Sequence, residues 1–106
     1  MSINAVSSVN VVSSGDKVTI ILNGRFEQAT SRSFRETLLK ALKEPPTEVC
    51  IHLGAIDYID SSALGLLLMA REMAEKSGKT VTLSGATGMV RKALEFAKLN
   101  TLFKML

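Results

Sequence analysis

The chain has 106 residues, of which 46% are hydrophobic and 22% charged, the composition of one ordinary globular domain. Its net charge of +3 is spread among mixed basic and acidic residues and tryptophan is absent, so nucleic acid is disfavoured as a partner. No apolar run reaches the length of a membrane span, the N-terminus lacks a signal-peptide pattern, and one cysteine excludes an internal disulfide. We therefore expect a cytoplasmic protein with no membrane partner.

The first part of the chain predicts a β-hairpin. Residues 3–12 alternate loosely and include Val9, Val11 and Val12, which is typical of an edge strand. Residues 13–16 predict a turn, and residues 17–22 are β-branched and apolar. We expect this second strand to end at Asn23 and Gly24.

A helical pattern then runs from about residue 28 to residue 43. Its inward positions are Phe34, Leu38, Ala41 and Leu42. Pro45 ends the helix, because the residue before a proline is driven out of the α region. A short strand at residues 49–53 follows, with apolar residues on both faces, as in an internal strand of a sheet. We expect Cys50 and His52, in this strand, to be structural residues.

The longest helical pattern begins at Ser61 and reaches about Lys76. Asp60 and Ser61 are both good helix-capping residues, and the helix presents free backbone N–H groups and its positive dipole end there. The simplest interpretation of the pair is therefore an N-terminal cap. The apolar residues that would seat this helix on a sheet are Ala63, Leu66, Leu67, Ala70, Met73 and Ala74.

Leu64 and Leu68 fall outside that apolar stripe and share a helix face with Ser61 and Gly65. Two interpretations stay open. Either another element of the fold covers the two leucines, or they form a docking face for a partner, with a modifiable serine beside it.

After a stop at Gly78, residues 80–83 predict a strand, and a third helix follows Gly88. The inward positions of that helix are Val90, Ala93, Leu94 and Ala97. A last short strand is expected at residues 103–106. Strands joined through helices favour parallel pairing, so we expect a single α/β domain over residues 1–106 with a mixed sheet and helices packed mainly on one face.

The run Asp60-Ser61-Ser62-Ala63-Leu64-Gly65, preceded by a strand, resembles the signature of the STAS domain, in particular that of bacterial anti-sigma-factor antagonists. The resemblance covers nearly the whole chain. It implies that a partner kinase phosphorylates Ser61. It also implies a partner-binding surface that comprises Asp60, Ser61, Ser62, Leu64, Gly65, Leu68 and Glu27.

The function implied by this resemblance is that of a switched binding protein. Unmodified, it would bind a serine-kinase anti-sigma factor; phosphorylation of Ser61 would release it, and a metal-dependent serine phosphatase would reset it. ATP would bind the kinase, so we expect this chain to need no cofactor. We also expect no enzyme activity, because there is no G-x-S-x-G elbow, no P-loop and no metal-ligand pattern, and no motif links the single histidine to Ser61.

Two other interpretations remain open. The chain could be a STAS scaffold subunit of a transporter or of a larger signalling complex, in which Ser61 is an N-cap only. It could also be a self-assembling structural module, because many STAS domains close with a further C-terminal helix that has no counterpart before Leu106. The surface left uncovered would then favour self-association.

Two residues before the first helix bear on partner choice. By the resemblance, Glu27 matches the second acid of a family segment near the phosphorylation site, whereas Arg25 stands where the first acid is expected. The alternative for Glu27 is a solvated acid in the first turn of a helix, where negative charge is favourable. His52 and Ala63 also depart from the family pattern.

Overall fold

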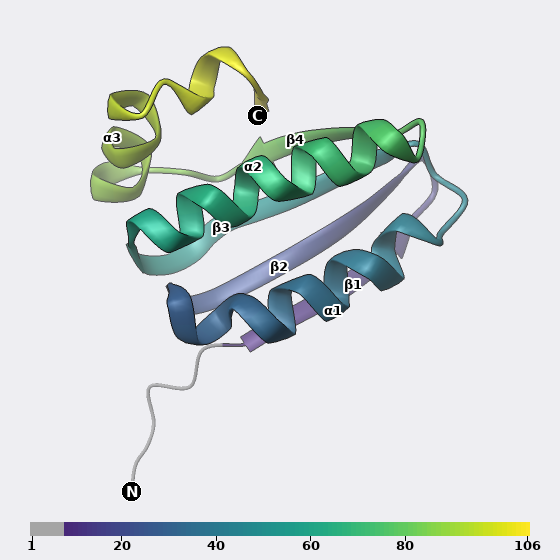
Figure 1. Cartoon of the computed structure of the whole chain (residues 1–106), viewed down its shortest axis with the longest axis horizontal. Coiled ribbons are helices and arrows are strands. Elements are labelled where there is room, and N and C mark those ends of the chain that lie inside the picture. Colours follow the sequence, from purple (N-terminus) through teal and green to yellow (C-terminus); the bar gives the residue numbers. More distant parts are fainter. Residues whose placement is uncertain (1–7) are drawn as a thin grey trace, which may run out of the picture.

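The computed structural model describes residues 8–106, which form one five-stranded sheet and three α-helices (Figure 1). The strands are β1 (Ser8–Ser14), β2 (Lys17–Phe26), β3 (Glu48–Ile59), β4 (Thr80–Ser84) and β5 (Lys104–Met105). The helices are α1 (Ser31–Leu42), α2 (Ser61–Lys76) and α3 (Gly88–Phe96), with short 3-10 turns η1 (Gln28–Thr30) and η2 (Leu99–Thr101). The part of the expected first strand at residues 3–7 lies outside the described residues.

The sheet order is the chain order, β1-β2-β3-β4-β5. Only β1 and β2 are antiparallel, and every later neighbour is parallel and reached through a helix. Successive right-handed crossovers in one direction place their helices on the same face of a sheet. Figure 1 shows α1 and α2 lying across that face. The predicted α/β fold with a leading hairpin is confirmed.

Alternation along the strands separates the two faces of the sheet. The strand side chains that pack under the helices are buried and apolar. They are Val18, Ile20 and Leu22 of β2, Val49, Ile51 and Leu53 of β3, and Val81 and Leu83 of β4. The opposite face is more polar, with Thr19, Cys50 and Thr82 in register across β2, β3 and β4.

Two strands run further than the sequence indicates. The predicted end of β2 at Asn23 and Gly24 is wrong, because β2 continues to Phe26 and β3 continues to Ile59. Gly24 has a φ of +82°, and the pairing register shifts on either side of it, so this glycine forms an irregularity within the strand. Because the strands are longer, Phe26 and Ile59 lie side by side just before the start of α2.

The other end of α2 follows the prediction. The Lys79 N–H donates to the Ala74 carbonyl at 2.8 Å and the Gly78 N–H donates to the Glu75 carbonyl at 3.1 Å, the two bonds of a Schellman motif. Gly78 supplies the required left-handed conformation, with a φ of +74°. Within residues 8–106, no helix is long and apolar enough to cross a membrane.

Candidate functional site

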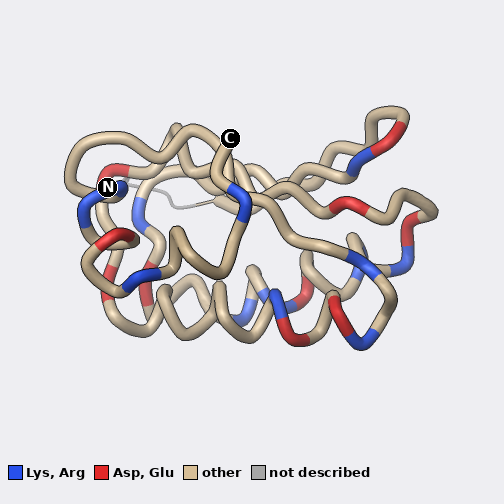
Figure 2. Tube along the Cα trace, turned by 90° about the horizontal axis from the view of Figure 1, so that it is seen from above, with Lys and Arg blue, Asp and Glu red and all other residues tan. Residues whose placement is uncertain are grey.

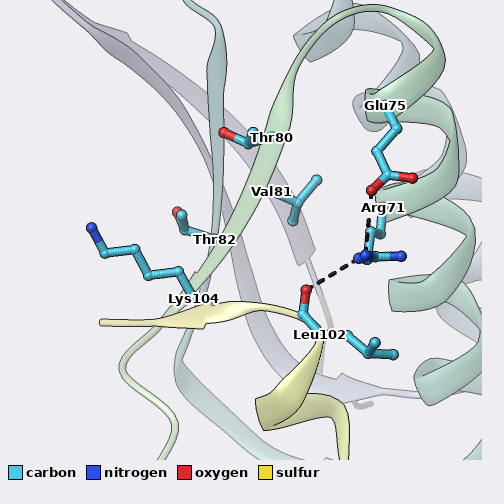
Figure 3. A pocket seen from close by; sticks show the side chains of 7 residues that line it. All are labelled: Arg71, Glu75, Thr80, Val81, Thr82, Leu102 and Lys104. Atoms are coloured by element: carbon cyan, nitrogen blue, oxygen red, sulfur yellow. Dashed lines mark hydrogen bonds and ion pairs between the residues drawn. The ribbon is translucent and has the colours of Figure 1, made fainter.

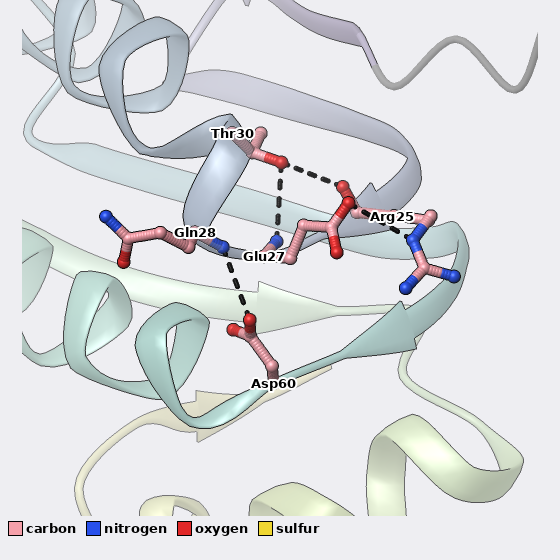
Figure 4. A network of polar contacts seen from close by, with 5 residues as sticks. All are labelled: Arg25, Glu27, Gln28, Thr30 and Asp60. Carbon is pink, nitrogen blue, oxygen red and sulfur yellow. Dashed lines mark hydrogen bonds and ion pairs between the residues drawn. The ribbon is translucent and has the colours of Figure 1, made fainter.

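Asp60 is the N-cap of α2 (Figure 4). Its Oδ1 accepts a hydrogen bond from the Ala63 N–H at 2.9 Å, and its Oδ2 accepts one from the Gln28 N–H at 3.3 Å. The Asp60 N–H donates to the Phe26 carbonyl at 3.3 Å. One residue therefore caps the helix and joins it to η1 and to the end of β2.

Ser61 is the first residue of α2 and is exposed to solvent. Within residues 8–106 its hydroxyl makes no hydrogen bond. The interpretation of Ser61 as the cap is wrong, because the Asp60 carboxylate takes the N–H that a capping side chain would accept. Ser62, the next residue, is half-buried. Of the two hydroxyls, that of Ser61 is therefore the more accessible.

The two leucines outside the core stripe behave differently. Leu68 is 42% exposed, whereas Leu64 is half-buried and packs against the core. Between them on the outer face lies Gly65, where an added Cβ would meet no atom within 4 Å. Leu68 and Gly65 are therefore exposed to solvent, and the half-buried Leu64 lies at the edge of this exposed surface. We call Ser61, Leu64, Gly65 and Leu68 the α2 outer face.

Charged side chains border this face towards the C-terminal half of α2. A shallow hollow there is lined by Gly65, Leu68, Met69, Arg71, Glu72 and Glu75. Arg71 bridges two parts of the fold: it pairs with Glu75 at 3.4 Å, and its Nε donates to the Leu102 carbonyl at 3.1 Å (Figure 3). Arg71 thereby ties α2 to the C-terminal segment.

Glu27 lies at the start of η1, next to the Asp60 cap (Figure 4). Its carboxylate accepts a hydrogen bond from Arg25 Nε at 3.1 Å, and the Arg25 guanidinium lies 3.8 Å from the centre of the Tyr58 ring. The hydrogen bond that Arg25 donates to Glu27 is the main cause that raises the pKa of Arg25 above its ordinary value. Glu27 is therefore a half-buried, ion-paired residue rather than the freely solvated acid of the alternative interpretation.

The Glu27 turn is fixed by Thr30. The Thr30 hydroxyl accepts a hydrogen bond from the Glu27 N–H at 3.3 Å and donates one to the Arg25 carbonyl at 2.9 Å. Thr30 is one of the few buried polar residues in the described part of the chain. Arg25, Glu27 and Asp60 thus belong to one hydrogen-bonded region at the carboxyl ends of β2 and β3.

His52 and Cys50 lie on the polar face of the sheet. His52 Nδ1 lies 2.9 Å from Ser84 Oγ, and Cys50 Sγ donates to the same oxygen at 3.3 Å. The His52 ring fills the space beside Gly54 and Gly85, where an added Cβ would come within 2.8 Å and 2.7 Å of it. These contacts agree with a structural role. Within residues 8–106, no group of three or more His, Cys, Asp or Glu side chains could hold a metal ion.

Two exposed apolar residues on α3 were not anticipated from the sequence. Met89 is 72% exposed and Phe96 is 92% exposed, and their spacing of seven places them on one face of the helix. Arg91 and Lys92 are exposed on the same helix. Figure 2 shows that basic and acidic positions are interspersed over the molecule. In Figure 1, α3 lies at the same end of the molecule as the start of α2. The spacing itself was available in the sequence and could have identified this face.

Comparisons with known proteins agree with this fold. The family model described as "Mlab, STAS domain" matches residues 9–106. A STAS-domain containing protein of Pseudomonas aeruginosa is 32% identical over 105 residues, which covers 99% of both chains.

Solved structures with the same fold include anti-sigma factor antagonists. One from Mycobacterium paratuberculosis has a TM-score of 0.84 at 15% identity, covering 99% of this chain and 89% of that one. SpoIIAA in its unphosphorylated form has a TM-score of 0.78 at 20% identity, covering 93% and 88%. A sulfate transporter family protein from Wolinella succinogenes has a TM-score of 0.71 at 23% identity, covering 86% and 75%. On the family match and the relative from Pseudomonas, this chain belongs to the STAS domain family.

Proposed function

We propose that this protein is an anti-sigma-factor antagonist switched by phosphorylation of Ser61. Unmodified, it binds a serine-kinase anti-sigma factor; phosphorylated, it is released, and a metal-dependent serine phosphatase restores it. The observation that carries this proposal is that two neighbouring residues have separate roles at the start of α2. Asp60 caps the helix, so the exposed Ser61 hydroxyl is available for chemistry that the fold does not need.

A phosphate on Ser61 is compatible with the fold. It adds about −1.5 to −2 charges at neutral pH. The N-terminus of a helix stabilises an anion by roughly 0.3–1 kcal/mol, which offsets part of the repulsion from the Asp60 carboxylate. The group is exposed, so the dianion stays hydrated in the free protein.

The same phosphate is costly in a complex. A dianion next to Leu64, Gly65 and Leu68 would lose its water against any partner that covers the α2 outer face. A loss of about 3 kcal/mol corresponds to roughly a hundredfold weaker binding. The modification therefore acts on the interface and leaves the domain folded.

Structures that share this fold support the proposal. Proteins with this fold include several anti-sigma factor antagonists, and SpoIIAA has been solved in both its unphosphorylated and its phosphorylated form. In this proposal ATP binds to the kinase, and this chain contributes only the acceptor hydroxyl.

A second candidate function is that of an unphosphorylated scaffold in a transporter. It is favoured by the sulfate transporter family protein that shares this fold. In that case the α2 outer face would still bind a partner, but Ser61 would take no phosphate. The two candidates therefore differ in one measurable property, the modification of Ser61.

The deciding experiment combines the protein with the serine-kinase anti-sigma factors of its own genome and ATP. We expect one phosphate, located by mass spectrometry on Ser61. Ser61→Asp should weaken kinase binding about a hundredfold while the melting temperature stays nearly unchanged. Ser62→Asp is the matched control, because it places the same charge one residue further along the helix.

Phosphate found mainly on Ser62 would contradict the assignment of the site. A protein that no such kinase binds or modifies, but that purifies in a complex with transporter subunits, would favour the scaffold. A Ser61→Asp protein that melts many degrees lower would mean that its binding defect reflects unfolding.

A further inference from the structure

The two edges of the sheet are built differently. At one edge, β5 is only two residues long and one of them is Lys104, so this edge is short and charged. At the other edge, β1 has seven residues, none of them charged and none of them proline. Natural proteins usually block such an edge with lysine, proline, a bulge or a very short strand. Within the described residues, β1 carries none of these devices.

The exposed side of β1 is also apolar in part. Val11 is 40% exposed and Val12 is 48% exposed, on opposite faces of the strand. Val11 lies opposite the buried Ile20 and so is on the face of the sheet that the helices cover, whereas Val12 lies opposite Thr19 on the polar face. A strand added outside β1 would therefore cover apolar surface on both faces of the sheet.

The hairpin register determines which peptide groups of β1 point outward. The turn between β1 and β2 has two residues, and Ser14 lies opposite Lys17, which makes these two a hydrogen-bonded pair. Such pairs alternate along an antiparallel ladder, so Asn10 and Val12 direct their N–H and C=O groups towards β2. The outward-facing peptide groups belong to Val9, Val11 and Ser13.

We propose that β1 pairs with β1 of a second copy of this chain, antiparallel and about a two-fold axis at Val11, to form one continuous sheet. In this register Val11 lies opposite its own copy, Val9 lies opposite Ser13, and Asn10 lies opposite Val12. Every outward-facing N–H and C=O of Val9, Val11 and Ser13 then has a partner, and β1 itself places no charged side chain at the junction.

A second copy fits this edge because the strand is complementary to itself. A two-fold interface joins the same patch on both subunits and satisfies both unpaired edges at once. The strand holds no charge that would select an acidic or a basic partner instead. In Figure 1, β1 lies at one side of the sheet beyond β2, whereas α2 packs with β3 and β4. Pairing through β1 therefore leaves the α2 outer face free on each copy and does not depend on the function proposed for Ser61.

The test is the association state of the full-length protein, measured by sedimentation velocity from micromolar to millimolar concentration. We expect a reversible dimer. Val11→Pro should raise its dissociation constant by at least about tenfold, because it removes an outward donor and leaves the bonds between β1 and β2 in place. Val11→Lys should raise the dissociation constant in the same way, and it replaces Val11→Pro as the test if the proline variant does not fold. Leu39→Lys is the matched control: Leu39 is 46% exposed, but it lies on the side of α1 that borders Met73 and Lys76 of α2, and the dimer should be unchanged.

Hydrogen exchange locates the contact. We expect the amides of Val11 and Ser13 to gain protection as the dimer forms, while that of Val12, bonded to β2, is protected throughout. A chain that stays monomeric at millimolar concentration would overturn the proposal. A dimer that survives both Val11 substitutions, or one that Leu39→Lys disrupts, would also overturn it. Equal protection of the Val11 and Ser13 amides at every concentration would overturn it as well, because the chain itself would then cover β1.

Discussion

The carboxylate of Asp60 joins two segments that are far apart in the sequence. It accepts one hydrogen bond from Ala63 in α2 and one from Gln28 in η1. The loss of both bonds in Asp60→Ala should lower the free energy of unfolding by about 1–3 kcal/mol. Asp60→Asn is the control, because its single side-chain oxygen can keep the cap and should retain most of the stability. Urea unfolding of both variants measures the difference, and equal stabilities would contradict the capping role.

The fold does not explain the presence of a glycine at position 65. A glycine inside a helix costs roughly 0.5–1 kcal/mol relative to alanine, and no atom of the described structure would obstruct a Cβ here. Gly65→Ala should therefore stabilise the protein by about that amount. If the partner's backbone approaches this point, the same change should weaken binding. Thermal unfolding and partner titration test both effects. A variant with no gain in stability would show that the helix itself requires the glycine.

The resemblance identified the junction but not which of its residues caps the helix. Asp60 and Ser61 are both common caps, so the sequence alone left the choice between them open. The backbone settles it, since Asp60 is extended and Ser61 is already helical. The pairing of Arg25 with Glu27 and Tyr58 was equally hidden, because it depends on how β2 and β3 lie beside each other.

Within α2, the apolar stripe that seats the helix followed directly from its spacing. Ala63, Leu66, Leu67, Ala70 and Ala74 are buried, as predicted. The same spacing put Leu64 and Leu68 on one face, yet neighbouring elements cover part of Leu64 and little of Leu68. Periodicity assigns a residue to a face, but only the packed fold determines how far that face is covered.

This difference separates the two leucines experimentally. Leu68→Ala should cost less than about 1 kcal/mol of stability but weaken partner binding by about 1–2 kcal/mol, as an exposed apolar contact does. Leu64→Ala should cost more stability, about 1–3 kcal/mol, because part of its side chain packs against the core. Denaturant unfolding and titration with the kinase measure the two quantities. A Leu68→Ala protein that binds normally would place the partner elsewhere.

The ends of the strands were the least predictable elements. Asn-Gly is a strong turn sequence, so the prediction ended β2 at Gly24. The strand continues because β3 offers residues 55–59 as a parallel partner beyond the irregularity. The pairing of β2 with β3 joins segments far apart in the sequence, so no pattern within residues 20–30 predicts it.

For the molecule as a whole, the sequence sufficed to predict the fold class. Each strand pattern alternates with a helix pattern after the hairpin, and this order has few solutions under right-handed crossover. The placement of α1 and α2 on one face followed from the same rule. The loose alternation of residues 3–12 predicted an edge strand, and β1, over the described residues from Ser8, is the outermost strand on one side of the sheet. What the sequence did not reveal is how unequal the two edges are, because nothing in residues 103–106 states that so short a strand forms the other edge.

The identity of sheet order and chain order has a consequence for how the protein is made. A ribosome releases β1 and β2 before the other strands, and their pairing uses no later part of the chain. Each later strand then emerges next to a neighbour that already exists, so no segment waits for a distant part of the chain to be synthesised. The nascent protein can add one strand and one helix at a time, in the direction of translation, until β5 arrives last.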